Sequence, residues 1–145
     1  MTTVQDLLRR KGPAVYSVAP TDSVLVAADL MNQYSVGGLV VVDGQGQVVG
    51  MFTERDILRR VLARRRDPDG TLVAEVMTTG VMVCRPETTL EECAAVMTTK
   101  RIRHLPVRDE MGLIGIVTIG DLLAAQVDDQ LATIQYLTSF VFDNR

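Results

Sequence analysis

The sequence predicts an α+β fold with layers of the α/β type, in which two β-α-β-β-α repeats are followed by an extra C-terminal helix. Two heptads of one pattern, GMFTERD (50–56) and GIVTIGD (115–121), point to the repeats, and PTDSVLVAADLMNQYSVGGLVVVD (20–43) aligns with PETTLEECAAVMTTKRIRHLPVRD (86–109). The second copy follows the first by 66 residues, or by 65 after a one-residue deletion in a turn. Turns tolerate such a deletion, so we interpret the halves as true repeats.

Short apolar runs bounded by turn residues predict the strands of both repeats. Six strands are expected, three in each repeat, at 15–19, 38–42, 48–52, 81–85, 104–107 and 113–117. In each repeat the second and third strands are joined by a tight turn that carries glycine.

Capping residues and helical spacing predict the helices. Thr88 followed by Glu91 forms a capping-box pattern at the first helix of the second repeat, and Asp22 occupies the equivalent capping position in the first repeat. The last helix of each repeat is expected to begin at Thr53 or at Thr118.

Two segments lie outside the repeats, a short leading helix and a C-terminal amphipathic helix. The predicted boundaries are a leader at 1–12, a first repeat at 13–66, a connector at 67–76, a second repeat at 77–127 and a final helix at 128–145. Apolar residues fall on one face near the C-terminus, at Val127, Leu131, Ile134, Leu137 and Val141. This face needs cover, either from the two halves of the chain or from a second subunit.

Composition excludes several classes of protein. Apolar residues make up 47% of the chain and its formal net charge is −3, so we expect a packed core and no general affinity for nucleic acid. No apolar stretch is long enough to span a membrane, and the N-terminus carries no secretory signal. We therefore expect a cytoplasmic protein. Cys84 and Cys93 are expected to be buried, reduced thiols rather than zinc ligands.

No arrangement of nucleophile, base and acid that would support catalysis is visible in the sequence, which contains a single histidine. It also contains no P-loop and no GxGxxG dinucleotide motif. We expect a protein that is not an enzyme.

The repeated heptad has the chemistry of a ligand site. A strand that turns into a helix presents free N–H groups, and Gly50 and Gly115 permit close approach to the backbone. Asp56, three residues after Thr53, suits a vicinal diol such as that of a ribose, because its two oxygens both accept hydrogen bonds. Thr-x-x-Asp is also close to a capping box, so the pair can instead serve only the helix.

The two repeats differ just before their second strands. Arg103 and His104 stand where the first repeat has Gly37 and Gly38, and they follow Lys100 and Arg101. Phosphate contact by Arg103 or His104 is one interpretation, and a partly buried, hydrogen-bonded histidine is the other. Lys100 and Arg101 also suit a solvated helix end, where they complement the dipole.

Five arginines follow the first heptad and suggest a nucleic-acid site. They are Arg59, Arg60, Arg64, Arg65 and Arg66. A solvated helix face is the favoured interpretation.

Paired β-α-β-β-α repeats that end in G-apolar-x-T-x-x-D, with an H-L-P-V strand, resemble tandem cystathionine-β-synthase (CBS) domains. The resemblance covers about residues 13–127, and the chain is similar to the small stand-alone CBS-pair proteins of bacteria and organelles. It implies that the repeats pack about a pseudo-twofold axis and form two clefts for adenosine-containing ligands.

The resemblance also implies roles for individual residues. The heptad Asp would hold the ribose hydroxyls, with the heptad Thr near ribose or phosphate; these residues are Asp56 with Thr53, and Asp121 with Thr118. Arg103 and His104 would meet phosphate in the cleft around Asp56. The adenine would rest near Val18 or Cys84. Because Gly37 and Gly38 bring no charge, we expect the cleft around Asp121 to hold phosphate less firmly.

The expected function is that of a regulatory module. We expect it to bind an adenosine-containing ligand of the AMP, ATP, NAD(H) or S-adenosylmethionine class, with AMP favoured, and to need no obligatory cofactor. We also expect the protein to form a homodimer and to signal energy or redox state to an unidentified target protein. The alternative is a ligand-free interaction or scaffolding module, in which the heptads are helix caps.

Overall fold

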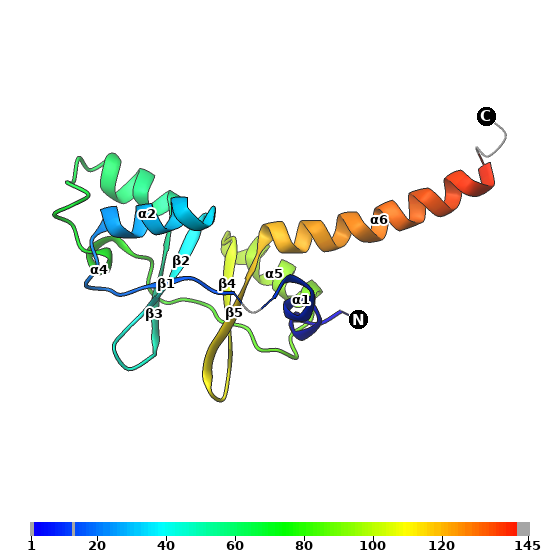
Figure 1. Ribbon diagram of the computed structural model, residues 1–145, viewed down its shortest axis with the longest axis horizontal. Coiled ribbons are helices and arrows are strands. Elements are labelled where there is room, and N and C mark those ends of the chain that lie inside the picture. The colour runs from blue at the N-terminus through cyan, green and yellow to red at the C-terminus, as the bar shows by residue number, and fades with distance from the viewer. Residues whose placement is uncertain (1, 13, 142–145) are drawn as a thin grey trace.

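The computed structural model describes residues 2–12 and 14–141, without the side chains at 129, 132, 140 and 141. It has the predicted α+β architecture, with two similar halves side by side and a long helix that leaves them (Figure 1). The helices are α1 (Val4–Lys11), α2 (Val24–Tyr34), α3 (Glu54–Asp56), the π-helix η1 (Ile57–Leu62), α4 (Val73–Val76), α5 (Leu90–Lys100) and α6 (Ile119–Val141). The strands are β1 (Ser17–Val18), β2 (Gly38–Val42), β3 (Val48–Thr53), β4 (His104–Asp109) and β5 (Gly112–Thr118).

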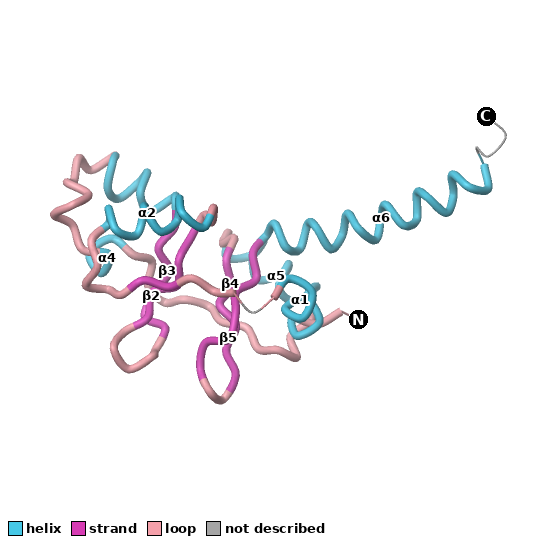
Figure 2. Tube along the Cα trace, viewed as in Figure 1, coloured by secondary structure: helices cyan, strands magenta, loops and turns pink. Residues whose placement is uncertain are grey.

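Each half contains a small sheet built on an antiparallel hairpin (Figure 2). In the first half β1 runs parallel to β2, which pairs with β3, and in the second half β4 pairs with β5. Four of the six predicted strands are confirmed at nearly their predicted bounds. The first, predicted over 15–19, is reduced to the two residues of β1.

The strand predicted at 81–85 is wrong. Only the parallel bridge between Cys84 and Val107 forms there, in place of a strand equivalent to β1. The apolar side chains of Met82 and Val83 are exposed rather than paired against a sheet. Apolar composition alone cannot distinguish such a segment from a strand.

The helix caps lie one residue later than predicted in both repeats. Helix α5 begins with a capping box between Thr89 and Glu92, and Ser23 caps α2. The side chains of Thr88 and Asp22 instead accept hydrogen bonds from the preceding turns, at the amides of Arg85 and Ala19. Neighbouring Ser, Thr and Asp residues compete for the cap, so its position was ambiguous in the sequence.

Each half has its own core. Helix α1 precedes the first half in the chain but packs in the second core, and α4 precedes the second half but packs in the first core. Val4 and Leu7 of α1 are buried with the second repeat. Val73 and Val76 of α4 are buried with the first. Backbone hydrogen bonds fix both crossings, from Val4 to the Thr88 carbonyl and from Val73 to that of Asp22.

The last helix of the second repeat and the predicted C-terminal helix are one continuous helix, α6. It projects away from both halves (Figure 1). Val127, Leu131, Ile134 and Leu137 are each about half exposed, and the side chain of Val141 lies outside the described part of the chain. Among the described residues, no helix is both long and apolar enough to cross a lipid bilayer.

The glycine that opens the first heptad is needed for packing. A Cβ at Gly50 would lie 2.6 Å from Met77 Sδ and 2.8 Å from the carbonyl oxygen of Thr78. We predict that Gly50→Ala lowers the free energy of unfolding by about 1–3 kcal/mol, because the backbone at Thr78 would have to move away from the added methyl group. Chemical denaturation measures this.

Gly44→Ala is the matched control, because a Cβ at Gly44 would meet nothing within 4 Å. Its free energy of unfolding should stay within about 0.5 kcal/mol of that of the original protein. Equal effects of the two substitutions would contradict a packing role for Gly50.

Candidate functional site

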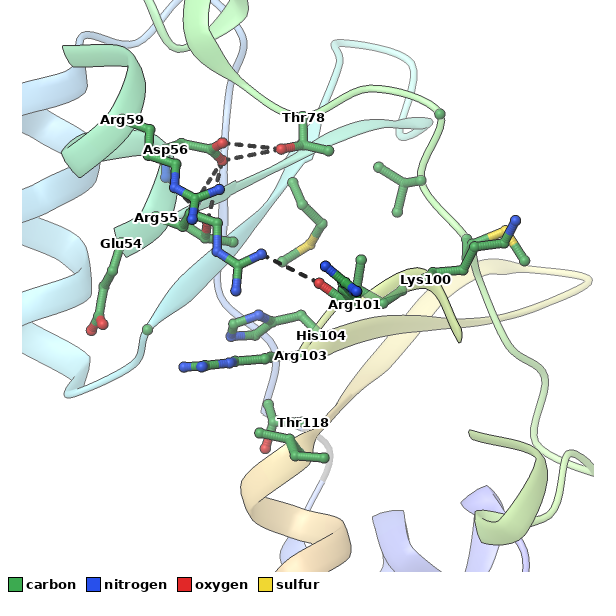
Figure 3. Close-up of a pocket in the computed structure, with 18 of the residues that line it drawn as sticks. Glu54, Arg55, Asp56, Arg59, Thr78, Lys100, Arg101, Arg103, His104 and Thr118 are labelled. Atoms are coloured by element: carbon green, nitrogen blue, oxygen red, sulfur yellow. Dashed lines mark hydrogen bonds between the residues drawn. The ribbon is translucent and has the colours of Figure 1, made fainter. Parts of the chain in front are cut away.

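A cleft of about 700 Å³ lies between the two repeats (Figure 3). One wall is formed by the end of β3, α3 and η1. The other is formed by the end of α5, the start of β4 and the start of α6. The segment that follows α4 contributes Thr78, Gly80, Val81 and Met82. The cleft therefore collects residues that are far apart in the sequence.

Asp56 lies on the first wall and is 4% exposed. Its Oδ2 accepts a hydrogen bond from the amide of Thr53 at 3.0 Å, and the Thr53 hydroxyl accepts one from the amide of Asp56 at 3.4 Å. Thr53 and Asp56 thus form the capping box that the sequence left open as an alternative. The hydroxyl of Thr78 donates to Asp56 Oδ1 at 3.0 Å, and Arg60 Nε lies 3.7 Å from the same oxygen. The carboxylate is held firmly at the edge of the cleft.

The second heptad forms the same capping arrangement. The amide of Thr118 donates to Asp121 Oδ2 at 2.9 Å, and the amide of Asp121 donates to the Thr118 hydroxyl at 3.1 Å. Thr118 lines the same cleft as Asp56, whereas Asp121 does not. Asp121 instead forms an ion pair with Lys11 of α1.

Arg103 and His104 enter the cleft from the second repeat, opposite Asp56 (Figure 3). The structure thus brings together Thr53, Asp56, Arg103 and His104, as the sequence predicted. His104 packs where the first repeat has no side chain, since a Cβ at Gly38 would lie 3.1 Å from His104 Nε2. The glycine of one repeat therefore accommodates the histidine of the other.

The remaining predicted site residues are placed differently. Gly37 lines the cleft, but Gly38 does not. Val18 and Cys84 are buried in the cores of the first and second repeat, and neither lines the cleft. A hydrogen bond with Cys93, together with burial, raises the pKa of the Cys84 thiol, which keeps that thiol protonated and unreactive.

Six permanently charged side chains make the cleft cationic. They are Arg55, Arg59, Arg60, Lys100, Arg101 and Arg103, against the two carboxylates Glu54 and Asp56. Arg60 pairs with Asp56, and Arg55 donates to the carbonyl oxygen of Arg101 at 3.3 Å. The side chains of Arg59, Lys100, Arg101 and Arg103 have no carboxylate within ion-pair distance among the described residues.

Sequence reasoning missed several of these residues. It assigned Arg59 and Arg60 to a solvated helix face and Lys100 and Arg101 to a solvated helix end; they are exposed, but they also line the cleft. The π-helical turn places Arg59 and Arg60 beside Asp56. The signal that would have found them is their closeness in sequence to the heptad. Thr78 carried no comparable signal, because it reaches Asp56 only through the path that the chain takes after α4.

His104 is only partly exposed, and its surroundings favour its neutral form. Burial lowers its pKa below the ordinary value, Glu54 and Asp121 raise it, and Arg103 and Lys11 lower it. Burial is the largest of these influences. A neutral imidazole offers one donor and one acceptor to a ligand in the cleft.

No group of three or more His, Cys, Asp or Glu side chains that could hold a metal ion occurs in the described part of the chain.

Comparison with known proteins identifies the class to which this fold and cleft belong. The CBS domain matches the chain twice, over residues 3–63 and 73–128, so the chain belongs to the CBS-domain family. CBS pairs are generally regulatory modules.

Particular relatives are similar along most of the chain. The CBS domain-containing protein YhcV of Bacillus subtilis is 39% identical, over 91% of this chain and 91% of its own length. The mitochondrial CBS domain-containing protein CBSX3 of Arabidopsis thaliana is 35% identical, over 97% of this chain and 72% of its own length. A CBS-domain protein of Burkholderia ambifaria has a solved structure with a TM-score of 0.84 and 41% identity, covering 89% of this chain and 96% of that one.

The lowered pKa of His104 gives a pH prediction. Between the folded-state pKa and the unfolded value near 6.5, the unfolded chain binds more protons, so the stability that depends on neutral His104 is present above pH 6.5 and is lost as the pH falls. NMR of the imidazole C–H signals should show a midpoint below 6.5. The signal is readily assigned because the chain has one histidine. A midpoint above 6.5 in the protein without ligand would contradict the burial described here.

Proposed function

We propose that the cleft between the repeats binds an adenine nucleotide and that the chain signals the bound state to a separate protein. The observation that carries this proposal is the pairing of a fixed carboxylate, Asp56, with the unpaired cations of the opposite wall. A carboxylate can accept hydrogen bonds from a ribose diol, and cationic side chains bind phosphate. A volume of about 700 Å³ is within the range of small-molecule sites.

The charge of the cleft supports nucleotides over uncharged nucleosides. Arg59, Lys100, Arg101 and Arg103 line the same cleft without carboxylate partners in the described structure, and a bound phosphate would offset part of their positive charge. AMP is the ligand that the sequence favours, and ATP and NAD(H) carry further phosphate charge. S-adenosylmethionine shares the ribose diol but brings a cationic sulfur, which this wall disfavours.

The alternative function is that of a ligand-free interaction module. The internal hydrogen bonds of both heptads favour it, because Thr53 with Asp56, and Thr118 with Asp121, cap helices without any ligand. A diol could reach Asp56 only by displacing Thr78 or Arg60 from the carboxylate.

The proposal includes no catalytic step, and it gives the chain a cytoplasmic location. It also includes a homodimer, for which the half-exposed apolar face of α6 is the support. Val127, Leu131, Ile134 and Leu137 would be covered there by a second copy of the chain.

Arg103 provides a sharp test, because it is exposed and its loss should not disturb the fold. We predict that Arg103→Ala weakens AMP and ATP binding by roughly tenfold or more, since it removes a charge-assisted contact to phosphate, and leaves adenosine binding unchanged. Isothermal titration calorimetry with AMP, ATP, NADH, S-adenosylmethionine and adenosine measures this. Bound phosphate should also raise the pKa of His104, which NMR detects independently.

Arg108→Ala is the matched control, because Arg108 is an exposed arginine on β4, the strand that Arg103 directly precedes, and it does not line the cleft. Its nucleotide affinities should equal those of the original protein. If the folded original protein shows no saturable binding of any of the ligands, the nucleotide proposal fails and the ligand-free module takes its place.

A further inference from the structure

We propose that the second heptad of this chain holds helix α1 instead of a ligand, so that each chain carries one nucleotide site, at Asp56. The sequence predicts a second ribose site at Asp121. The part of this proposal that concerns nucleotide number rests on the function proposed above. The part that concerns α1 stands on contacts within the chain.

Lys11, the last residue of α1, occupies the carboxylate of Asp121. Its Nζ donates to Asp121 Oδ2 at 2.7 Å and to the carbonyl oxygen of Ile116 at 2.9 Å. The side chains of Lys11 and Asp121 are 26% and 20% exposed, so the pair is partly shielded from water. A charged hydrogen bond in such surroundings is stronger than an exposed ion pair. Lys11 therefore shares Oδ2 with the Thr118 amide, and its ammonium group stands beside the carboxylate that a ribose diol would have to approach.

The repeats show why Lys11 reaches this position and no lysine reaches Asp56. Leu8 packs against Gly115 as Met77 packs against Gly50, and Val18 bridges its sheet as Cys84 does. Nine residues separate Leu8 from Val18, but only six separate Met77 from Cys84. The three additional residues accommodate another turn of helix, since α1 has eight residues and α4 has four. Lys11 lies on that extra turn.

The cations of the first cleft are missing at the equivalent positions around Asp121. The repeat offset matches Arg59 and Arg60 with Ala124 and Ala125, Lys100 and Arg101 with Tyr34 and Ser35, Arg55 with Gly120, and Arg103 with Gly37. All six permanent positive charges are thus replaced by uncharged residues. The cation that the described structure places at Asp121 is Lys11, which is already paired with that carboxylate.

Two tyrosines stack on each other at positions equivalent to two residues of the first cleft. Tyr16 and Tyr34 stack with their ring centroids 3.9 Å apart and an angle of 10° between their planes. Their equivalents in the other repeat, Met82 and Lys100, line the open cleft. An aromatic pair adds stability beyond the area that it buries, so opening this region for a ligand has a cost that the first cleft does not have.

The test combines Lys11→Met, Asp121→Asn and the double variant with two measurements. Amide hydrogen exchange over residues 7–12 reports the docking of α1, and calorimetric titration with AMP and ATP counts sites. Arg10→Met is the matched control, because Arg10 lies on the same helix and forms an exposed ion pair with Asp128 at 3.3 Å. In Asp121→Asn the side-chain oxygen can still accept the hydrogen bond from the Thr118 amide, so the helix cap is retained.

We expect Lys11→Met and Asp121→Asn each to speed exchange in α1 by roughly three- to tenfold, and the double variant to go no further than either one. Arg10→Met should change exchange less than twofold. The original protein should bind one nucleotide per chain, and Asp121→Asn should leave that number unchanged.

Two nucleotides per chain, with one lost in Asp121→Asn, would overturn the proposal. Unchanged exchange in Lys11→Met, or additive effects in the double variant, would also overturn it. If no nucleotide binds, the function proposed for the Asp56 cleft fails, and the exchange measurements alone decide whether Asp121 anchors α1.

Discussion

The burial of α1 against the second repeat, and of α4 against the first, is the interaction on which the rest of the structure depends. Val4 and Val73 are fully buried, and each contributes about 1.5–3 kcal/mol by leaving water. Because α1 completes the second core and α4 completes the first, the chain must cross between the repeats twice. The second crossing places Thr78 against Asp56, and the first places Lys11 against Asp121. The surroundings of both heptad carboxylates therefore follow from this exchange.

The two heptads show how a helix cap can also orient a carboxylate beside a cleft. The hydrogen bonds between Thr53 and Asp56 that begin a helix also hold the carboxylate in one orientation at the cleft. Thr118 and Asp121 make the same bonds beside a lysine. Since the cap has a value of its own, about 0.5–2 kcal/mol in typical proteins, the pattern persists with or without a ligand. The number of such motifs in a sequence therefore does not give the number of ligand sites.

Much of the fold could be predicted from the sequence because the repeat and the apolar spacing are local signals. The hairpins and the placement of Arg103 and His104 beside Asp56 were predicted, the latter from the resemblance to CBS pairs. The roles of Thr78 and Lys11 depend on chain crossings that no local pattern encodes. The segment at 81–85 was mistaken for a strand because it is apolar, although Val81 and Met82 line the cleft and the side chain of Val83 is exposed. The resemblance to CBS pairs implied that Val18 and Cys84 lie near a ligand, but both side chains are buried in the cores.

The continuity of α6 links the cleft to a distant part of the molecular surface. Its first residue, Ile119, lines the cleft, and the helix extends without interruption for 23 residues. At 1.5 Å per residue it is a rod about 35 Å long, so a tilt of about 10° at its base would displace its far end by about 6 Å. The helix has the geometry of a lever arm, because a small tilt at its base becomes a much larger displacement at its far end.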